Sequence, residues 1–189
     1  MSFRRHVSHL RIGVASNSVQ FDTSTILDDF LYLGAKGVTS NLEQLESQNI
    51  SYVINCSSEA EFATYPPEFN YLHVMVDDSA NAPIAQYFEQ CCEFITQARM
   101  EDKAVLVHCT MGMSRSATIV LAYLVGRGNM SLMEAFEYIK QRRPVASPNP
   151  GFMAQLVEYE VKVRGKASVD SAKYDAKSRF GDAKHFAKA

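Results

Sequence analysis

The run Ala-Val-Leu-Val at residues 104–107 constrains the fold most, because all four side chains are apolar and polar residues bound the run on both sides. A short run of this kind is typical of a strand that is buried on both faces of a parallel sheet. Parallel strands need long crossover connections, which are usually helices. We therefore expect a central sheet with helices packed on its faces.

The segments on either side of this run alternate between strand and helix patterns. β-Branched and aromatic residues predict further strands at residues 30–33, 51–55 and 71–76. Helical spacing of apolar residues predicts helices at residues 38–48, 84–99, 115–127, 131–142 and 151–163. Ser131 and Glu134 form a capping-box pattern at the start of one of them. The predicted fold class is α/β, with a central, mostly parallel sheet flanked by helices.

The charge of the chain divides it into three parts. Residues 28–164 carry 10 Lys/Arg against 17 Asp/Glu, whereas residues 165–189 carry six against three. We predict an N-terminal arm at residues 1–26, one domain at 27–164 and a basic, flexible tail at 165–189, for which docking on a partner is the alternative. An acidic domain argues against a nucleic-acid-binding groove, which needs a basic face.

Cysteine usage indicates a reducing compartment, and the lengths of the apolar runs bear on whether the chain crosses a membrane. Four cysteines in 189 residues are too few for a disulfide scaffold, and no Cys/His spacing predicts a zinc site. Free thiols favour the cytoplasm, and the nucleus is an additional expected location. No apolar run approaches the roughly 20 residues that span a bilayer, so we expect no transmembrane segment.

The run at 104–107 leads directly into His-Cys-Thr-Met-Gly-Met-Ser-Arg-Ser at residues 108–116, and a predicted helix follows. Ligands of open α/β sheets bind at the carboxyl ends of the strands. There, successive loop N–H groups and a helix N-terminus form a cradle for an anion. Gly112 permits the tight turn, and Arg115 offers a planar fork of donors to two phosphate oxygens.

Cys109 lies at the mouth of this predicted cradle. A positive field favours the thiolate, which is the nucleophilic form of cysteine. The loop is therefore predicted both to bind a phosphate group and to attack it. His108 is expected to hold the loop through hydrogen bonds, and the alternative role for it is that of a catalytic proton shuttle. The predicted phosphate-binding residues between Cys109 and Arg115 are Thr110, Met111, Gly112, Met113 and Ser114.

The pattern H-C-x-x-G-x-x-R-S resembles the signature loop of the cysteine-dependent protein phosphatases, in particular the dual-specificity class. Further matches lie at residues 31–34, 122–124, 141–143, 148–149 and 152–156, so that the resemblance spans about residues 27–160. It is strongest to the small, atypical members without an N-terminal docking domain. The resemblance implies hydrolysis of phosphotyrosine and of phosphoserine or phosphothreonine in protein substrates, through a phosphocysteine intermediate and without a metal or other cofactor.

The resemblance also implies roles for single residues. Asp78 is expected to be the general acid and base, with the adjacent Asp77 as the alternative, since spacing alone does not rank two neighbouring carboxylates. Ser116 is expected to help the thiolate leave in the second step. Arg143 resembles a position near the pocket rim, where it would contact a second phosphate; the alternative is a cation at a helix C-terminus.

Two alternatives concern function and regulation. A catalytically weak, phosphate-binding pseudo-phosphatase or scaffold is the alternative function, although such relatives usually lack the Cys or the Arg that this chain retains. Neutral residues at Thr110, Met111 and Met113 make a highly charged lipid headgroup a poor candidate substrate. Cys56 is expected either to form a reversible disulfide with Cys109 or to be a buried thiol.

Overall fold

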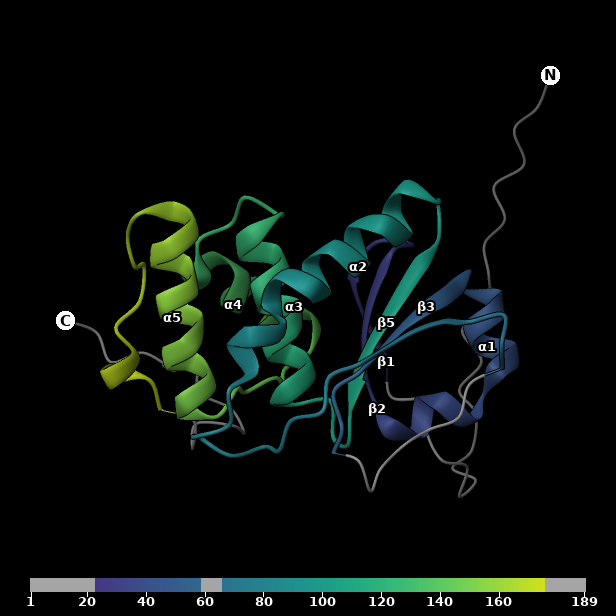
Figure 1. Ribbon diagram of the computed structural model, residues 1–189, viewed down its shortest axis with the longest axis horizontal. Helices are drawn as coiled ribbons and strands as arrows, with labels where there is room; N and C mark the ends of the chain where they lie inside the picture. Colours follow the sequence, from purple (N-terminus) through teal and green to yellow (C-terminus); the bar gives the residue numbers. More distant parts are fainter. Residues whose placement is uncertain (1–22, 59–65, 176–189) are drawn as a thin grey trace.

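The computed structural model describes residues 23–58 and 66–175. A five-stranded sheet with the order β1-β2-β5-β3-β4 lies at its centre (Figure 1). Only β1 runs antiparallel to its neighbour, and the other neighbouring pairs are parallel. The strands are β1 (Thr23–Leu27), β2 (Leu31–Ala35), β3 (Ile50–Asn55), β4 (Asn70–His73) and β5 (Ala104–Cys109). The predicted α/β class with a mostly parallel sheet is confirmed.

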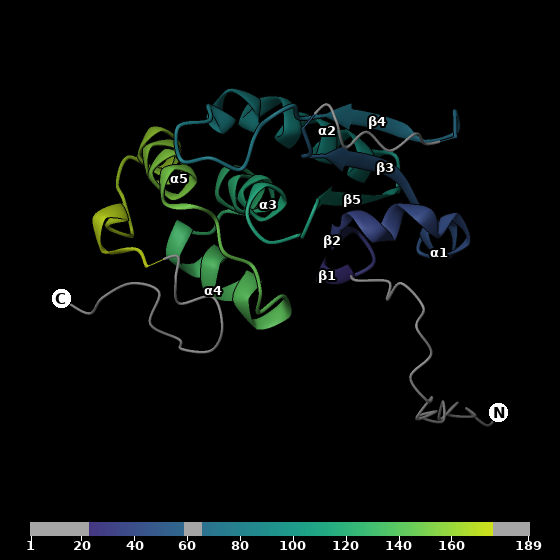
Figure 2. The same ribbon diagram turned by 90° about the horizontal axis from the view of Figure 1, so that it is seen from below.

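Helices cover both faces of the sheet. Figure 2 shows α1 on one side and α3, α4 and α5 on the other. The helices are α1 (Leu42–Ser47), α2 (Phe88–Met100), α3 (Arg115–Gly126), α4 (Leu132–Arg142) and α5 (Pro150–Arg164), with short 3₁₀ turns η1 (Lys36–Ser40), η3 (Ile84–Tyr87) and η4 (Ser171–Lys173).

Alternate residues of β5 belong to two separate apolar cores. Val105, Val107 and Cys109 lie in the larger core, which includes residues of α2 to α5. Ala104 and Leu106 lie in the smaller core, which includes residues of η1 and α1. Both faces of β5 are therefore buried, and this explains why its sequence is apolar without alternation.

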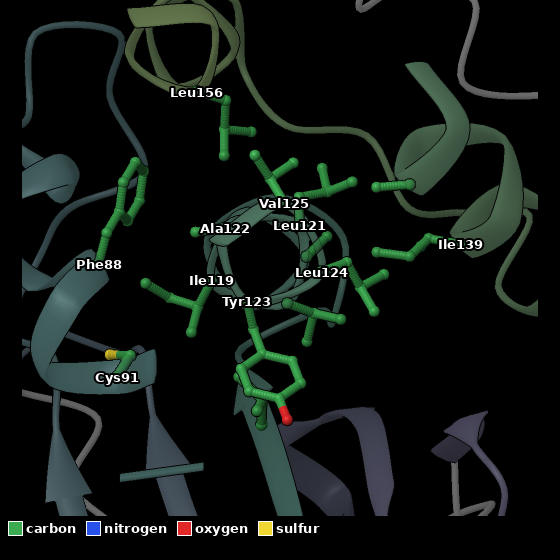
Figure 3. Packing of buried hydrophobic residues seen from close by; sticks show 14 of the residues in the cluster. Phe88, Cys91, Ile119, Leu121, Ala122, Tyr123, Leu124, Val125, Ile139 and Leu156 are labelled. Atoms are coloured by element: carbon green, nitrogen blue, oxygen red, sulfur yellow. The ribbon is translucent and has the colours of Figure 1, made fainter. Parts of the chain in front are cut away.

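Helix α3 is buried almost all round, with residues 115–125 inside the protein. Figure 3 looks along this helix and shows Phe88 and Cys91, Ile139 and Leu156 around it, which belong to α2, α4 and α5 respectively. Burial on every side holds α3 in a fixed position relative to β5. The loop that joins the two elements is consequently held at both ends.

The observed elements differ from the predicted ones mainly at their ends. The predicted arm overlaps β1, because residues 23–27 form the antiparallel edge of the sheet. Two predicted helices begin as the 3₁₀ turns η1 and η3, and β4 ends three residues before the predicted strand does. The capping box of Ser131 and Glu134 is present as predicted.

Part of the predicted C-terminal tail packs on the domain. The Tyr174 side chain is 7 % exposed, lies edge-on to Phe136, and donates a hydrogen bond from its hydroxyl to the Pro148 carbonyl at 2.8 Å. Residues 165–175 are thus part of the folded unit, and residues 176–189 lie outside the described residues. Within the described ranges, none of the helices combines the length and apolar character needed to cross a bilayer.

Candidate active site

The loop at residues 110–114 lies where the carboxyl ends of three parallel strands meet. The Cα partners of Cys109 and His108 on β2 are Ala35 and Gly34, and β3 borders β5 on the other side. The Lys36 N–H donates to the Thr110 carbonyl at 3.2 Å, which fastens the loop to the end of β2. The loop therefore occupies the edge of the sheet at which ligands of α/β folds bind.

The Cys109 sulfur accepts hydrogen bonds from the middle of the loop and from the first turn of α3. The Gly112 N–H and the Ser116 hydroxyl each lie 3.2 Å from Sγ. Gly112 has φ +63°, and a Cβ at this position would lie 2.6 Å from the Gly34 carbonyl oxygen. Two donors and the adjacent α3 N-terminus together favour negative charge on this sulfur.

The Arg115 guanidinium is held against the loop. Its side chain is nearly buried, with Nη2 donating to Thr110 Oγ1 at 2.9 Å and Nη1 donating to the Val76 carbonyl at 3.5 Å. The second contact brings the guanidinium next to the segment that carries Asp77 and Asp78. The arrangement therefore fixes a planar cation beside the predicted cradle.

Arg143 is not at a pocket rim, contrary to one of the two roles expected for it. Its side chain is 2 % exposed, Nε donates to the Gly112 carbonyl at 2.6 Å, and Nη2 donates to the Met111 carbonyl at 3.3 Å. Nη1 donates to Ser24 Oγ at 3.3 Å. When the N–H groups of a loop converge on an anion, the carbonyls of the loop face away from it. Arg143 donates hydrogen bonds to two of these carbonyls, on the side of the loop opposite the anion.

Asp78 is tied to the loop and to the start of α5. Its Oδ1 accepts hydrogen bonds from Ser114 Oγ at 2.6 Å and from Asn149 Nδ2 at 2.9 Å. Both Asp77 and Asp78 are exposed, but Asp77 makes no hydrogen bond with residues of the described ranges. Of the two neighbouring carboxylates, only Asp78 is thus linked to the predicted phosphate-binding residues.

His108 lies on the other side of β5 from Cys109. Adjacent residues of a strand face opposite ways, so the imidazole is directed toward the face of the sheet that α1 covers. Its side chain is fully buried, and burial lowers the pKa of His108 to about 4. The ring is accordingly neutral at physiological pH and faces away from the Cys109 sulfur.

Cys56 lies directly beside the loop. Its N–H donates to the His108 carbonyl at 2.8 Å, so Cys56 follows the parallel pairing of β3 with β5 next to Cys109. Both thiols are free, and burial raises the pKa of the Cys56 thiol. The geometry brings the two cysteines together, while the disulfide itself stays a prediction.

Two contributions to the site were missed from the sequence. Asn149 before Pro150 is a typical helix N-cap signal, and the side chain does accept a hydrogen bond from the Phe152 N–H. Its second contact, with Asp78, joins segments 71 residues apart and has no local sequence signal. The contact between Ser114 and Asp78 also has no local sequence signal.

No metal site accompanies these residues in the part of the chain that the structure describes, since no group of three or more His, Cys, Asp or Glu there could hold an ion. The groups that the site brings together are a thiol, a guanidinium, a carboxylate and backbone N–H groups.

Comparison with known proteins gives consistent matches. A family model described as "Dual specificity phosphatase, catalytic domain" matches residues 31–162. Dual specificity protein phosphatase 1 of Arabidopsis thaliana is 38% identical over 149 residues, which are 79% of this chain and 75% of that protein. Dual specificity protein phosphatase 14 of Mus musculus is 42% identical over 139 residues, or 74% of this chain and 70% of that protein. The crystal structure of human DUSP28 is similar with a TM-score of 0.71 and 32% identity, covering 75% of this chain and 95% of that chain.

Proposed function

The chain belongs to the dual-specificity phosphatase family and is a protein phosphatase, and from that premise we propose that it hydrolyses phosphotyrosine and phosphoserine or phosphothreonine through a phosphocysteine intermediate. The observation that carries this proposal is the Cys109 sulfur at the N-terminus of α3, with two hydrogen-bond donors at 3.2 Å. Donors in this position stabilise a thiolate and leave its remaining lone pairs free for attack.

In the first step, the Cys109 sulfur attacks phosphorus on the side opposite the departing oxygen. The S–P bond forms as the P–O bond to the amino-acid side chain breaks. The N–H groups of residues 110–115 and the Arg115 guanidinium hold the three equatorial oxygens, whose negative charge they stabilise. Contacts of Arg115 with Thr110 and the Val76 carbonyl orient its fork before the substrate arrives.

Asp78 donates a proton to the departing phenol or alcohol oxygen in this step. Its contact with Ser114 places the carboxyl at the edge of the same loop that holds the phosphate. Asp77 lacks this link within the described ranges, and this favours Asp78 over its neighbour for the role.

In the second step, water attacks phosphorus, the S–P bond breaks and inorganic phosphate leaves. Asp78, now ionised, accepts the proton of the attacking water, so the two steps together restore the enzyme. The Ser116 hydroxyl lies 3.2 Å from the sulfur and stabilises the thiolate as it leaves. A buried, neutral His108 supports the loop from the far side of β5 and takes no proton.

The side chains of the loop suit a substrate with one phosphate group. Met111 is 63% exposed, and Thr110 and Met113 are also uncharged, so the variable positions of the loop offer no additional cation. A phosphorylated side chain of a protein needs only the donors already described. A polyphosphorylated headgroup would require further positive charge around the loop.

The proposal is tested by phosphate release from a peptide phosphorylated on both Thr and Tyr, in excess EDTA, with Cys109→Ser as the paired control. We expect both phosphates to be released by the wild-type protein, and neither by the variant. Tight binding of the peptide by both proteins without release would instead support a phosphate-binding scaffold.

A further inference from the structure

The segment that carries Asp78 is exposed, yet it is attached to α5 at three places. Residues 77–81 are exposed to solvent, and a surface loop of this kind gains little from apolar burial. Asn149, Gly151 and Gln155, in the first turns of α5 and just before them, all contact residues 78–85. We call residues 77–83 the acid segment below.

Asn149 makes the contact that reaches the carboxylate itself. Its Oδ1 accepts the Phe152 N–H at 2.9 Å as the N-cap of α5, and this fixes which end of the amide faces the helix. Nδ2 then faces Asp78 Oδ1 at 2.9 Å. The Asn149 N–H donates to Ser114 Oγ at 3.1 Å, and Ser114 donates to the same Oδ1 at 2.6 Å. The three residues form a closed ring of hydrogen bonds.

Both donors of this ring occupy one oxygen of the Asp78 carboxyl group. Oδ2 accepts no hydrogen bond from residues in the described ranges. When the group is protonated, the proton belongs on Oδ2, because Oδ1 already accepts two hydrogen bonds. The ring thus selects which oxygen carries the proton that the leaving group receives.

The other two contacts hold the backbone of the acid segment. Gln155 Oε1 accepts the Ala85 N–H and its Nε2 donates to the Ala82 carbonyl, each at 2.9 Å. The Ala80 backbone packs directly on Gly151, where an added Cβ would overlap the Ala80 carbonyl oxygen. The segment is therefore clamped to a helix that is itself part of the core.

We propose that Asn149 is a positioning residue which, with Gly151 and Gln155, holds the Asp78 carboxyl group ready to donate a proton before substrate binds. The inference rests on the proposed function, since it assigns the acid of that reaction. The phosphate-binding loop does not depend on Asn149 for its contacts with Cys109 or Arg115. Loss of the Asn149 side chain should consequently impair protonation of the leaving group and spare nucleophilic attack.

The test compares two aryl phosphates that differ in how much they need a proton. p-Nitrophenolate leaves well as an anion, whereas phenolate leaves poorly without a proton. Asn149→Ser retains a good N-cap residue for α5 but is too short to reach Asp78. We compare kcat/KM, which covers the steps up to departure of the leaving group and excludes the later hydrolysis of the phosphocysteine, where Asp78 acts as base. We expect kcat/KM on phenyl phosphate to fall about 10-fold, within the total of 10²–10⁴ that a general acid supplies, and kcat/KM on p-nitrophenyl phosphate to change less than about twofold.

Three further variants separate positioning from folding. Gly151→Ala, which displaces the acid segment, should give the same selective loss. Asn41→Ser makes the same change at the N-cap of α1, on the other face of the sheet, and should leave both rates unaltered. In an Asp78→Asn background, Asn149→Ser should cause no additional loss, because its effect passes through the carboxyl group.

An equal loss on both substrates, no loss on either, or an additive loss in the Asp78→Asn background would overturn the inference. A readout without activity keeps it distinct from the proposed function. We expect hydrogen exchange of the amides in residues 77–85 to accelerate in Asn149→Ser and Gly151→Ala, and unchanged exchange in both would also overturn the clamp. If the wild-type protein hydrolysed neither phosphate, the proposed function would fail, while the exchange result would still decide whether the clamp exists.

Discussion

Replacement of Arg143 by Met tests whether this residue supports the loop from inside the protein or contacts substrate. The side chain is 2 % exposed, and its guanidinium donates to the Gly112 and Met111 carbonyls. Met retains most of the buried volume but supplies no donor. Each buried carbonyl left without its partner costs about 1–3 kcal/mol, so two of them predict a loss of about 2–6 kcal/mol in the free energy of unfolding.

The same substitution should also reduce activity on a substrate with a single phosphate. Without a donor behind them, the two peptide groups are free to rotate, and their N–H groups no longer converge on the phosphate. A misplacement of about 1 Å in a site of this kind can lower the rate about 10²-fold. Arg143→Lys keeps the charge but lacks the fork, and we expect it to recover only part of both losses.

Urea denaturation and steady-state hydrolysis of singly and doubly phosphorylated peptides measure these effects. An internal support predicts that Arg143→Met is less stable and less active on both peptides. If the variant kept wild-type stability and lost affinity only for the doubly phosphorylated peptide, Arg143 would contact a second phosphate, and the reasoning from burial would be refuted.

Three more predictions follow from neighbouring residues. Burial lowers the pKa of His108 from 6.5 to about 4, so the unfolded chain binds a proton that the folded chain does not, and stability should fall by about 2 kcal/mol from pH 7 to pH 5. Denaturation at both pH values should show this dependence in wild type and its absence in His108→Asn; equal dependence in the two proteins would contradict it. Gly112→Ala, with φ +63° and a Cβ 2.6 Å from the Gly34 carbonyl, should abolish phosphatase activity, and retention of activity in a peptide assay would disprove the constraint. Peroxide should join Cys56 and Cys109 in a disulfide, with two electrons passing to peroxide and two water molecules formed; peptide mapping that found only sulfinylated Cys109 would argue against it.

The sheet and the loop were predictable because local patterns encode them. Residues 104–107 are apolar on both faces, since the sheet has a core on each side, and the following Cys109-to-Arg115 loop needs only the strand, the turn and the helix that adjoin it. The capping box of Ser131 was readable for the same reason, because all its atoms lie within four residues.

The features that escaped prediction depend on contacts between distant segments. The sequence of β1 lacks a strand pattern of apolar residues, because only Ile26 of its five residues is buried. The strand joins the sheet through backbone pairing with β2. Arg143 has the same local sequence whether it points to solvent or to the Gly112 carbonyl, 31 residues away. Tyr174 likewise reaches Pro148 from a segment whose composition is that of a solvated tail.

The most direct test of the central claim is to trap phosphate on Cys109. Wild-type protein and Ser116→Ala would be mixed with phosphopeptide, quenched in acid within milliseconds and analysed by mass spectrometry of the intact chain and its peptides. We predict one phosphate per chain on the peptide that contains Cys109, with more of it in Ser116→Ala because the thiolate leaves more slowly, and none in Cys109→Ser. Phosphate release at the wild-type rate with no phosphorylated Cys109, or undiminished release by Cys109→Ser, would contradict the phosphocysteine mechanism.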